Sequence, residues 1–155
     1  MDIISFELGI LFLLLFMVPV LYIIYKSTSA QKRVKKEIQS LGKSQNLTLK
    51  NIELIGNTII GIDENNHNLV FSNIKKPKES FQIVPVGAIK TCEVKTHRIK
   101  NKSLDMVELE LKGPDLNKEI LFYEEQDESI VMDAEVCLHE VRKWEKTINQ
   151  NLQLV

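Results

Sequence analysis

Six basic side chains in two short segments are the residues whose type and spacing could bind an anion. They fall into two groups of three: Lys75, Lys76 and Lys78, and Arg98, Lys100 and Lys102. If both segments leave the same end of a sheet, their charges could meet a phosphate or an anionic lipid headgroup. The alternative is two solvated loops, since Lys is a mobile point charge and no aromatic or glycine-rich nest accompanies either group.

Residues that catalyse reactions or bind metals do not form a recognisable pattern in this sequence. His67, His97 and His139 lie on separate expected elements, without the spacing of metal ligands. The acidic run at 124–128 lacks the spacing and central glycine of a calcium-binding loop. Zinc-protease, serine-hydrolase and phosphate-loop motifs are also missing from the sequence. We therefore expect no catalytic residues, no cofactor and no metal, and hence a protein that is not an enzyme.

A charge-free segment near the N-terminus predicts a transmembrane helix. Residues 8–25 carry no charged side chain, and their apolar flank extends the segment to the roughly 20 residues that cross a hydrocarbon core of about 30 Å. A cleaved signal peptide is the alternative, but the residues before the apolar run are acidic and the only small-residue stretch follows Lys26. The interpretation is a retained anchor at residues 1–26.

Basic residues just beyond this run set the predicted orientation. Lys and Arg remain on the cytoplasmic side of a membrane, and five of them follow the run: Lys26, Lys32, Arg33, Lys35 and Lys36. We expect these five to contact the membrane surface. The prediction is a single-pass protein of the inner (cytoplasmic) membrane, with its N-terminus outside and its C-terminal domain in the cytoplasm. In that compartment Cys92 and Cys137 would be reduced core residues, whereas the opposite orientation would reopen the question of a disulfide.

Charge is distributed unevenly along the chain, although the formal net charge is only -1. A basic stretch at 26–46 and an acidic stretch at 124–145 would orient a domain against an anionic leaflet. Without an Arg-rich or aromatic-interleaved face, nucleic acid is not an expected partner. The expected partners are the bilayer and either anionic lipid headgroups or a membrane protein. We divide the chain into an anchor at 1–26, a basic juxtamembrane helix and linker at 27–46, and one domain at 47–155.

The juxtamembrane segment at 29–41 is expected to be helical. Val34, Ile38 and Leu41 have the spacing of one apolar stripe, with basic residues on the other faces. Two interpretations remain open: an amphipathic helix lying on lipid headgroups, or a charged stalk. Gly42 is expected to end this helix.

Short apolar runs separated by turn residues predict an antiparallel sheet or barrel over residues 47–123. Seven strands are expected, at 48–55, 58–63, 68–73, 80–84, 89–96, 106–111 and 118–123. A helix is expected at 131–151, with Leu138, Val141 and Trp144 on one apolar stripe and Ser129 or Asp133 as its N-cap. Such a helix must cover the open end or face of the sheet.

This order of elements resembles the pleckstrin-homology (PH) superfold, a bent sandwich closed at one end by a helix. The hairpin at 59–71 and the segment from Phe81 through Pro85 to Val94 are similar to bacterial PH-like and GRAM-like domains. The resemblance covers residues 47–152. It implies a mainly β, α+β fold: one transmembrane helix, a small seven-strand antiparallel PH-like sandwich or barrel, and a C-terminal amphipathic helix. The basic run that binds headgroups in eukaryotic members is absent, because Gly56 and Asn57 form the first turn.

The resemblance also implies a module that binds or scaffolds without catalysing a reaction. The favoured function is therefore a membrane-anchored protein that presents a PH-like domain at the cytoplasmic membrane face, where a sheet edge or loop end binds a protein or a lipid headgroup. The alternative is an accessory subunit whose span packs into a larger membrane complex, with the domain serving as a brace.

Overall fold

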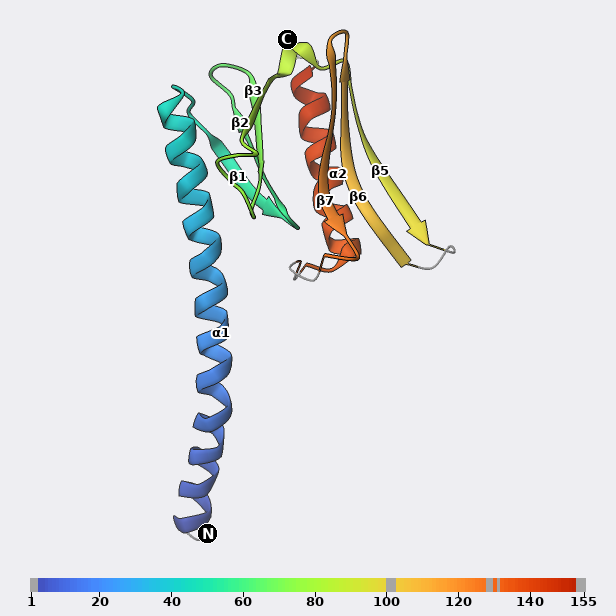
Figure 1. Cartoon of the computed structure of the whole chain (residues 1–155). Coiled ribbons are helices and arrows are strands. Elements are labelled where there is room, and N and C mark those ends of the chain that lie inside the picture. The colour runs from blue at the N-terminus through green and yellow to red at the C-terminus, as the bar shows by residue number, and fades with distance from the viewer. Residues whose placement is uncertain (1–2, 100–102, 128–129, 131, 153–155) are drawn as a thin grey trace. The chain divides into compact units, whose positions relative to one another are not determined.

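The computed structural model describes residues 3–99, 103–127, 130 and 132–152; within the first helix it describes the side chains of residues 11–22 and 31–44. Two compact units make up the chain, residues 1–34 and residues 35–155. Helix α1 (Ile3–Ser44) begins in the first unit, continues through Pro19 and ends in the second (Figure 1). The segments expected as an anchor and as a juxtamembrane helix therefore belong to one helix.

The predicted transmembrane helix is contradicted. Within the described part of the chain, no helix combines the length and the apolar character needed to cross a membrane. This finding also contradicts the predicted location, a single-pass protein of the inner membrane with its C-terminal domain in the cytoplasm.

Antiparallel strands in the second unit form two sheets (Figure 1). Sheet A has the order β1-β2-β3-β4, with strands Lys50–Ile55, Thr58–Asp63, Asn68–Asn73 and Gln82–Pro85. Sheet B has the order β5-β6-β7, with strands Thr91–Ile99, Ser103–Gly113 and Leu116–Glu124. A 3-10 turn, η1 (Val86–Ala88), lies between the sheets in sequence, and helix α2 (Ala134–Leu152) follows β7.

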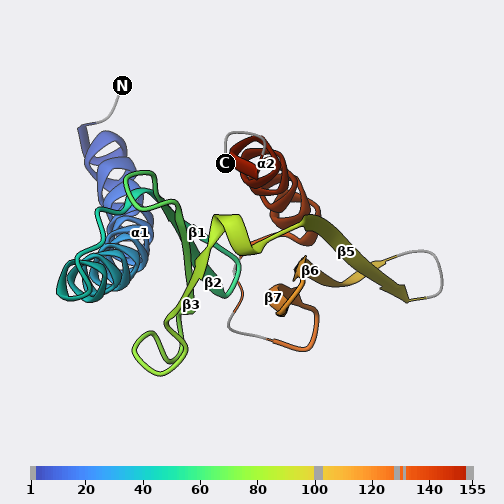
Figure 2. The same ribbon diagram turned by 90° about the horizontal axis from the view of Figure 1, so that it is seen from above.

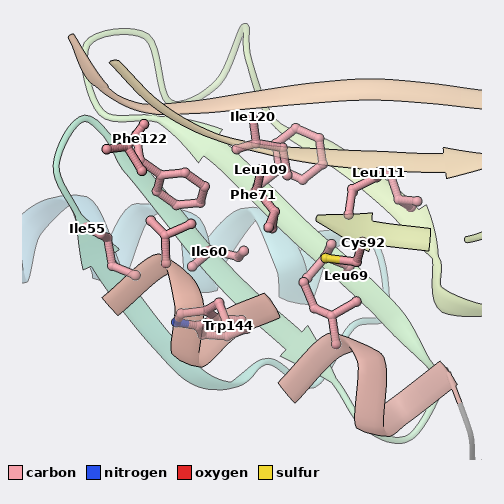
Figure 3. Packing of buried hydrophobic residues seen from close by; sticks show 14 of the residues in the cluster. Ile55, Ile60, Leu69, Phe71, Cys92, Leu109, Leu111, Ile120, Phe122 and Trp144 are labelled. Atoms are coloured by element: carbon pink, nitrogen blue, oxygen red, sulfur yellow. The ribbon is translucent and has the colours of Figure 1, made fainter. Parts of the chain in front are cut away.

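The core lies between the two sheets and α2. Val107, Leu109 and Leu111 of β6 are completely buried, because alternate residues of a strand point to the same face of the sheet. The apolar stripe of α2, from Cys137 through Trp144 to Ile148, is buried in the same cluster. Figure 3 shows side chains of both sheets and Trp144 of α2 pointing into this common interior.

The outer face of sheet A is covered by the last turns of α1, residues 35–44, which lie beside β1, β2 and β3 in both views (Figures 1 and 2). Ile38 of α1, Ile59 of β2 and Val70 of β3 are each at most 2% exposed, yet they lie outside the core cluster between the sheets. Strand β2 is therefore buried on both faces, and all six of its residues are buried. The apolar stripe of the 29–41 segment thus packs on protein at Ile38, while its two interpretations, an amphipathic helix on lipid headgroups or a charged stalk, stay predictions.

Helix α1 ends two residues later than the expected stop at Gly42. The carbonyl of Gly42 accepts the backbone N–H groups of Gln45 and Leu47, and Asn46 takes the left-handed conformation (φ 59°) that closes the helix. Gly42 has a different role, because a Cβ atom at this position would lie 2.8 Å from the Leu49 side chain. The glycine therefore allows close packing between the helix and the chain that follows it.

Candidate binding surface between β1 and α2

Helix α2 lies between two strand edges, β1 of sheet A and β5 of sheet B (Figure 2). Asp133 starts the helix as an N-cap, its Oδ1 accepting the backbone N–H of Glu135 at 2.9 Å, so one of the two predicted caps is confirmed. The buried stripe of α2 faces the core, and its two flanks face the two edges. These flanks differ in structure.

The flank facing β5 is closed by hydrogen bonds. The Glu145 carboxylate accepts the backbone N–H of Val94 at 2.8 Å, and the Asn149 side-chain amide donates to the carbonyl of Cys92 at 3.1 Å. Both backbone groups lie on the edge strand of sheet B. Because an unpaired strand edge can pair with another chain, these two side chains occupy positions that an added strand would need.

The flank facing β1 leaves a groove with a volume of about 260 Å³. We call it the β1 groove. Most of the residues that line it are polar: Asn51 and Glu53 of β1, Ile62 and Glu64 at the end of β2, and Glu140, Lys143, Trp144, Thr147 and Asn151 of α2. The α2 residues recur at spacings of three and four, so they form one face of the helix. Three carboxylates and one ammonium group therefore surround the groove.

Glu53 and Trp144 connect the two walls of the β1 groove. The indole N–H of Trp144 donates to the Glu53 carboxylate at 2.7 Å, and Trp144 is only 5% exposed. This bond satisfies the single polar atom of a buried aromatic side chain. Glu53 itself is exposed, and within the described residues it forms no ion pair, whereas Glu64 pairs with Lys50 and Glu140 pairs with Lys143.

A bulge in β1 shapes the groove. The register between β1 and β2 shifts between Lys50 and Glu53, and Asn51 takes the left-handed conformation with φ 52°. A bulge redirects the side chains of an edge strand. Here Asn51 and Glu53, two residues apart, both line the same groove.

Asp63 holds the end of the groove next to Glu64. Its carboxylate accepts the Asn66 side-chain amide at 2.6 Å and the Asn65 backbone N–H at 3.0 Å. Burial raises the pKa of Asp63, but these hydrogen bonds, with those from the backbone of Asn66 and Thr48, outweigh it and lower the pKa below 3.8. The ionised carboxylate thus fixes the β2–β3 turn, where His67 takes a left-handed conformation.

The basic residues expected to bind anions are engaged with carboxylates. Lys75 pairs with Asp127 at 2.6 Å, Lys76 with Glu79 at 3.2 Å, Lys78 with Glu37 at 3.9 Å and Arg98 with Glu135 at 3.2 Å. Lys100 and Lys102 lie outside the described residues. Because the described members of the two groups pair with different carboxylates, these contacts give no evidence of a shared anion site, which stays a prediction.

The five basic residues expected at a membrane surface lie along α1. Lys32, Arg33 and Lys36 are exposed and Lys35 is half-buried, while the side chain of Lys26 lies outside the described ones. They are distributed over both compact units, because the boundary between the units falls between residues 34 and 35. Their contact with a membrane surface stays a prediction.

The first hairpin turn, where the resemblance would place a headgroup site, packs against β7. Gly56 has φ 52°, and a Cβ atom there would lie 1.9 Å from the carbonyl oxygen of Phe122. The backbone N–H of Asn57 donates to that same carbonyl at 2.9 Å, and the Asn57 side chain donates to Asp127. This turn is therefore joined to sheet B rather than open to a ligand.

Both cysteines are buried in the core. Burial raises the pKa of each thiol to about 12, with the charges of Glu145 and Glu93 adding to the effect at Cys92. Thiols with such a high pKa are poor nucleophiles and poor metal ligands at neutral pH.

Sequence reasoning did not find the β1 groove. The polar face of α2 was visible as Glu140, Lys143, Thr147 and Asn151 at helical spacing, but that spacing does not show which strand the face approaches. Nor does any sequence pattern reveal the left-handed Asn51 inside a strand. The comparisons with known proteins gave no match to this chain, whether by family model, curated protein or solved structure.

Proposed function

We propose that this chain is a non-catalytic binding or scaffold protein, with a PH-like second unit whose working surface is the β1 groove. One observation carries the proposal: α2 bonds to the backbone of the β5 edge through Glu145 and Asn149 but leaves a groove of about 260 Å³, lined mostly by polar residues, beside the β1 edge. Binding sites are concave and contain a few polar groups that converge on one point. The groove has this character.

The charge of the groove favours a protein partner over an anionic lipid headgroup. Glu53, Glu64 and Glu140 line it, and Lys143 is the one basic residue of the lining. An anionic headgroup would be repelled by this surface, whereas a partner with Lys or Arg side chains would be attracted to it. The arrangement of four strands, three strands and a C-terminal helix supports the PH-like interpretation, in which such units bind partners.

Affinity capture from the native cell with charge-reversed variants tests this proposal. The groove variant is Glu53→Lys with Glu140→Lys. The matched control is Glu93→Lys with Glu119→Lys, which makes the same change of charge at two exposed residues of sheet B outside the groove. We expect a protein that is recovered at constant stoichiometry with the wild type and the control, and lost with the groove variant. Equal recovery with a groove variant that circular dichroism shows to be folded would refute the proposal.

A second function, an accessory subunit of a larger protein assembly, is favoured by a different surface. The large apolar side chains at residues 11–22 of α1 are 48–68% exposed. Apolar surface that is continuous around a helix is normally covered by another molecule. If a partner subunit covers it, the variant Leu15→Glu with Phe16→Glu will lose that subunit in purification while the β1 groove variant retains it. If both variants retain the partner subunit, this second function is excluded.

A further inference from the structure

The β1 groove runs beside the edge of a sheet. β1 is the terminal strand of sheet A, and among the described strands it pairs with β2 alone. In an antiparallel edge strand, every second residue directs its N–H and C=O groups away from its neighbour. Such a row of backbone groups is a template on which another extended chain can form a strand.

The other three edges of the two sheets are obstructed. At β5, Glu145 and Asn149 bond to two backbone groups of the edge, the N–H of Val94 and the carbonyl of Cys92. At β7, the carbonyls of Leu121 and Phe122 accept hydrogen bonds from Thr58 and Asn57 of the first hairpin. Strand β4 has only 4 residues and ends at Pro85, which cannot donate to a ladder. An added strand therefore has β1 as its best-suited edge.

The bulge limits how much of β1 such a strand can use. Regular pairing between β1 and β2 runs from Glu53 to Ile55, and the register shift lies before Glu53. A partner that pairs with this segment is short, and the bulge prevents the long flat pairing that leads to aggregation. The space beside the segment, between Glu53 and the α2 face, is where a partner side chain would lie.

Charge defines the chemistry of that side chain. The Glu53 carboxylate is exposed and, in the described part of the chain, has no cation within ion-pair distance. Glu64 and Glu140, the other two carboxylates of the lining, already hold Lys50 and Lys143. A Lys or Arg at one position of the added strand would neutralise Glu53 and keep the Trp144 indole bond in place.

We propose that the β1 edge binds a short, extended, basic segment of a partner protein as an added strand, with a Lys or Arg side chain in the groove at Glu53. This inference rests on the proposed function and names the chemistry of its partner. Binding has two parts: backbone hydrogen bonds to β1 supply affinity, and the cation at Glu53 supplies selectivity.

The chain contains a single tryptophan, and it lies in the groove as Trp144, so intrinsic fluorescence reports occupancy directly. The probe is a seven-residue peptide of alternating Thr or Val and Lys with blocked ends, titrated into the full chain. A saturable change in Trp144 fluorescence is expected. The variant Glu53→Gln should weaken binding about tenfold, the effect of losing one charge-assisted contact, while Glu119→Gln on β7 should leave it unchanged.

Two control peptides separate strand addition from charge attraction alone. Replacing every Val by Pro keeps all the charges but removes the backbone donors of those residues, and we expect binding to be lost. Replacing every Lys by Glu keeps the backbone donors, and we expect binding to be lost as well.

Four results would overturn the strand inference: equal binding of the Pro peptide, equal binding of the Glu peptide, equal binding by the Glu53→Gln variant, or no response to the basic peptide at all. None of these touches the proposed function, which depends on whether the groove variant loses its captured partner. If the partner is captured and the peptide is not bound, the groove is a binding surface of another kind.

Discussion

The two flanks of α2 show how one helix can close one sheet edge and leave another open. Towards β5, Glu145 and Asn149 are four residues apart, and both reach backbone groups of the edge strand. Towards β1, Glu140 and Lys143 pair with each other at 2.7 Å, and the single bond across the gap runs between the side chains of Trp144 and Glu53. Among the described residues, a strand edge is therefore closed where helix side chains bond to its backbone, and it stays open where they bond to other side chains.

Removing Trp144 should give the largest effect, because this residue belongs to both the core and the groove. Trp144→Ala is expected to lower the free energy of unfolding by about 3–5 kcal/mol, the usual effect of truncating a buried aromatic residue. Trp144→Phe keeps most of the ring and loses the indole bond to Glu53, so we expect a loss of about 1 kcal/mol. Urea denaturation followed by circular dichroism measures both. Equal losses would mean that the bond to Glu53, rather than burial, holds α2 against β1.

The two flanks should respond differently to loss of a carboxylate. Glu145→Ala leaves the backbone N–H of Val94 without its partner at a half-buried edge, and we expect a loss of about 1–2 kcal/mol. Glu53→Ala removes the acceptor of the Trp144 indole N–H, but water in the open groove can replace an exposed carboxylate there, so the expected loss is about 0.5–1 kcal/mol. Urea midpoints of the two variants at matched m-values test the difference. Analytical ultracentrifugation should also show more self-association for Glu145→Ala, because that change uncovers an edge; a monodisperse variant would contradict the edge-closing role.

Acid should destabilise the β2–β3 turn at the end of the β1 groove, because it protonates the Asp63 carboxylate. Its pKa in the folded chain lies below its ordinary value of 3.8, so its contribution to stability is complete above that pH and is lost as the pH falls through the folded pKa. Asp63→Asn should lower the free energy of unfolding by about 1 kcal/mol at neutral pH. The variant should also lose less stability than the wild type as the pH falls below 4. Denaturation curves from pH 7 to pH 2.5 measure this. If the variant lost as much stability below pH 4 as the wild type, a group other than Asp63 would be responsible for the acid sensitivity.

The smallest expected effect is a difference in thiol reactivity between Cys92, on the β5 flank, and Cys137. With both pKa values raised to about 12, only about one thiol in ten thousand is ionised at pH 8, so neither should react with a disulfide reagent in the folded chain. Glu145→Ala removes a charge that raises the pKa of Cys92 and loosens the edge beside it. Cys92 should then react a few-fold faster than Cys137, as measured by mass spectrometry after timed labelling. Equal rates would show that the β5 flank is not held by Glu145.

The sequence predicts elements well where local chemistry decides their bounds. Strands β2 and β3 begin and end at the expected residues, because Gly56 at one turn and His67 at the other adopt the left-handed conformations that those turns need. Strand β6 is longer than expected: Ser103 and the residues after it pair with β5 although they lack an apolar alternation. Pairing with a neighbour extends a strand beyond what its own pattern shows.

Features that depend on tertiary contacts were not predictable. The apolar stripe containing Ile38 was visible in the sequence, but such a stripe does not show whether it faces lipid, solvent or sheet A. The expected strands left residues 85–88 as a connection of unspecified structure, and the 3-10 turn η1 lies there. The β1 groove required three things that no pattern reveals: a left-handed Asn51, the partner of the Trp144 indole, and the register of α2 along β1.

The close approach of Gly56 to the Phe122 carbonyl gives β1 one fixed end. A backbone turn that admits no larger residue, bonded to β7 through Asn57, clamps the strand to sheet B at Ile55. At its other end β1 carries the bulge and borders the groove. Strand β1 is therefore joined to sheet B at its C-terminal end. A ligand in the groove would displace the N-terminal end of β1 more easily than this fixed end.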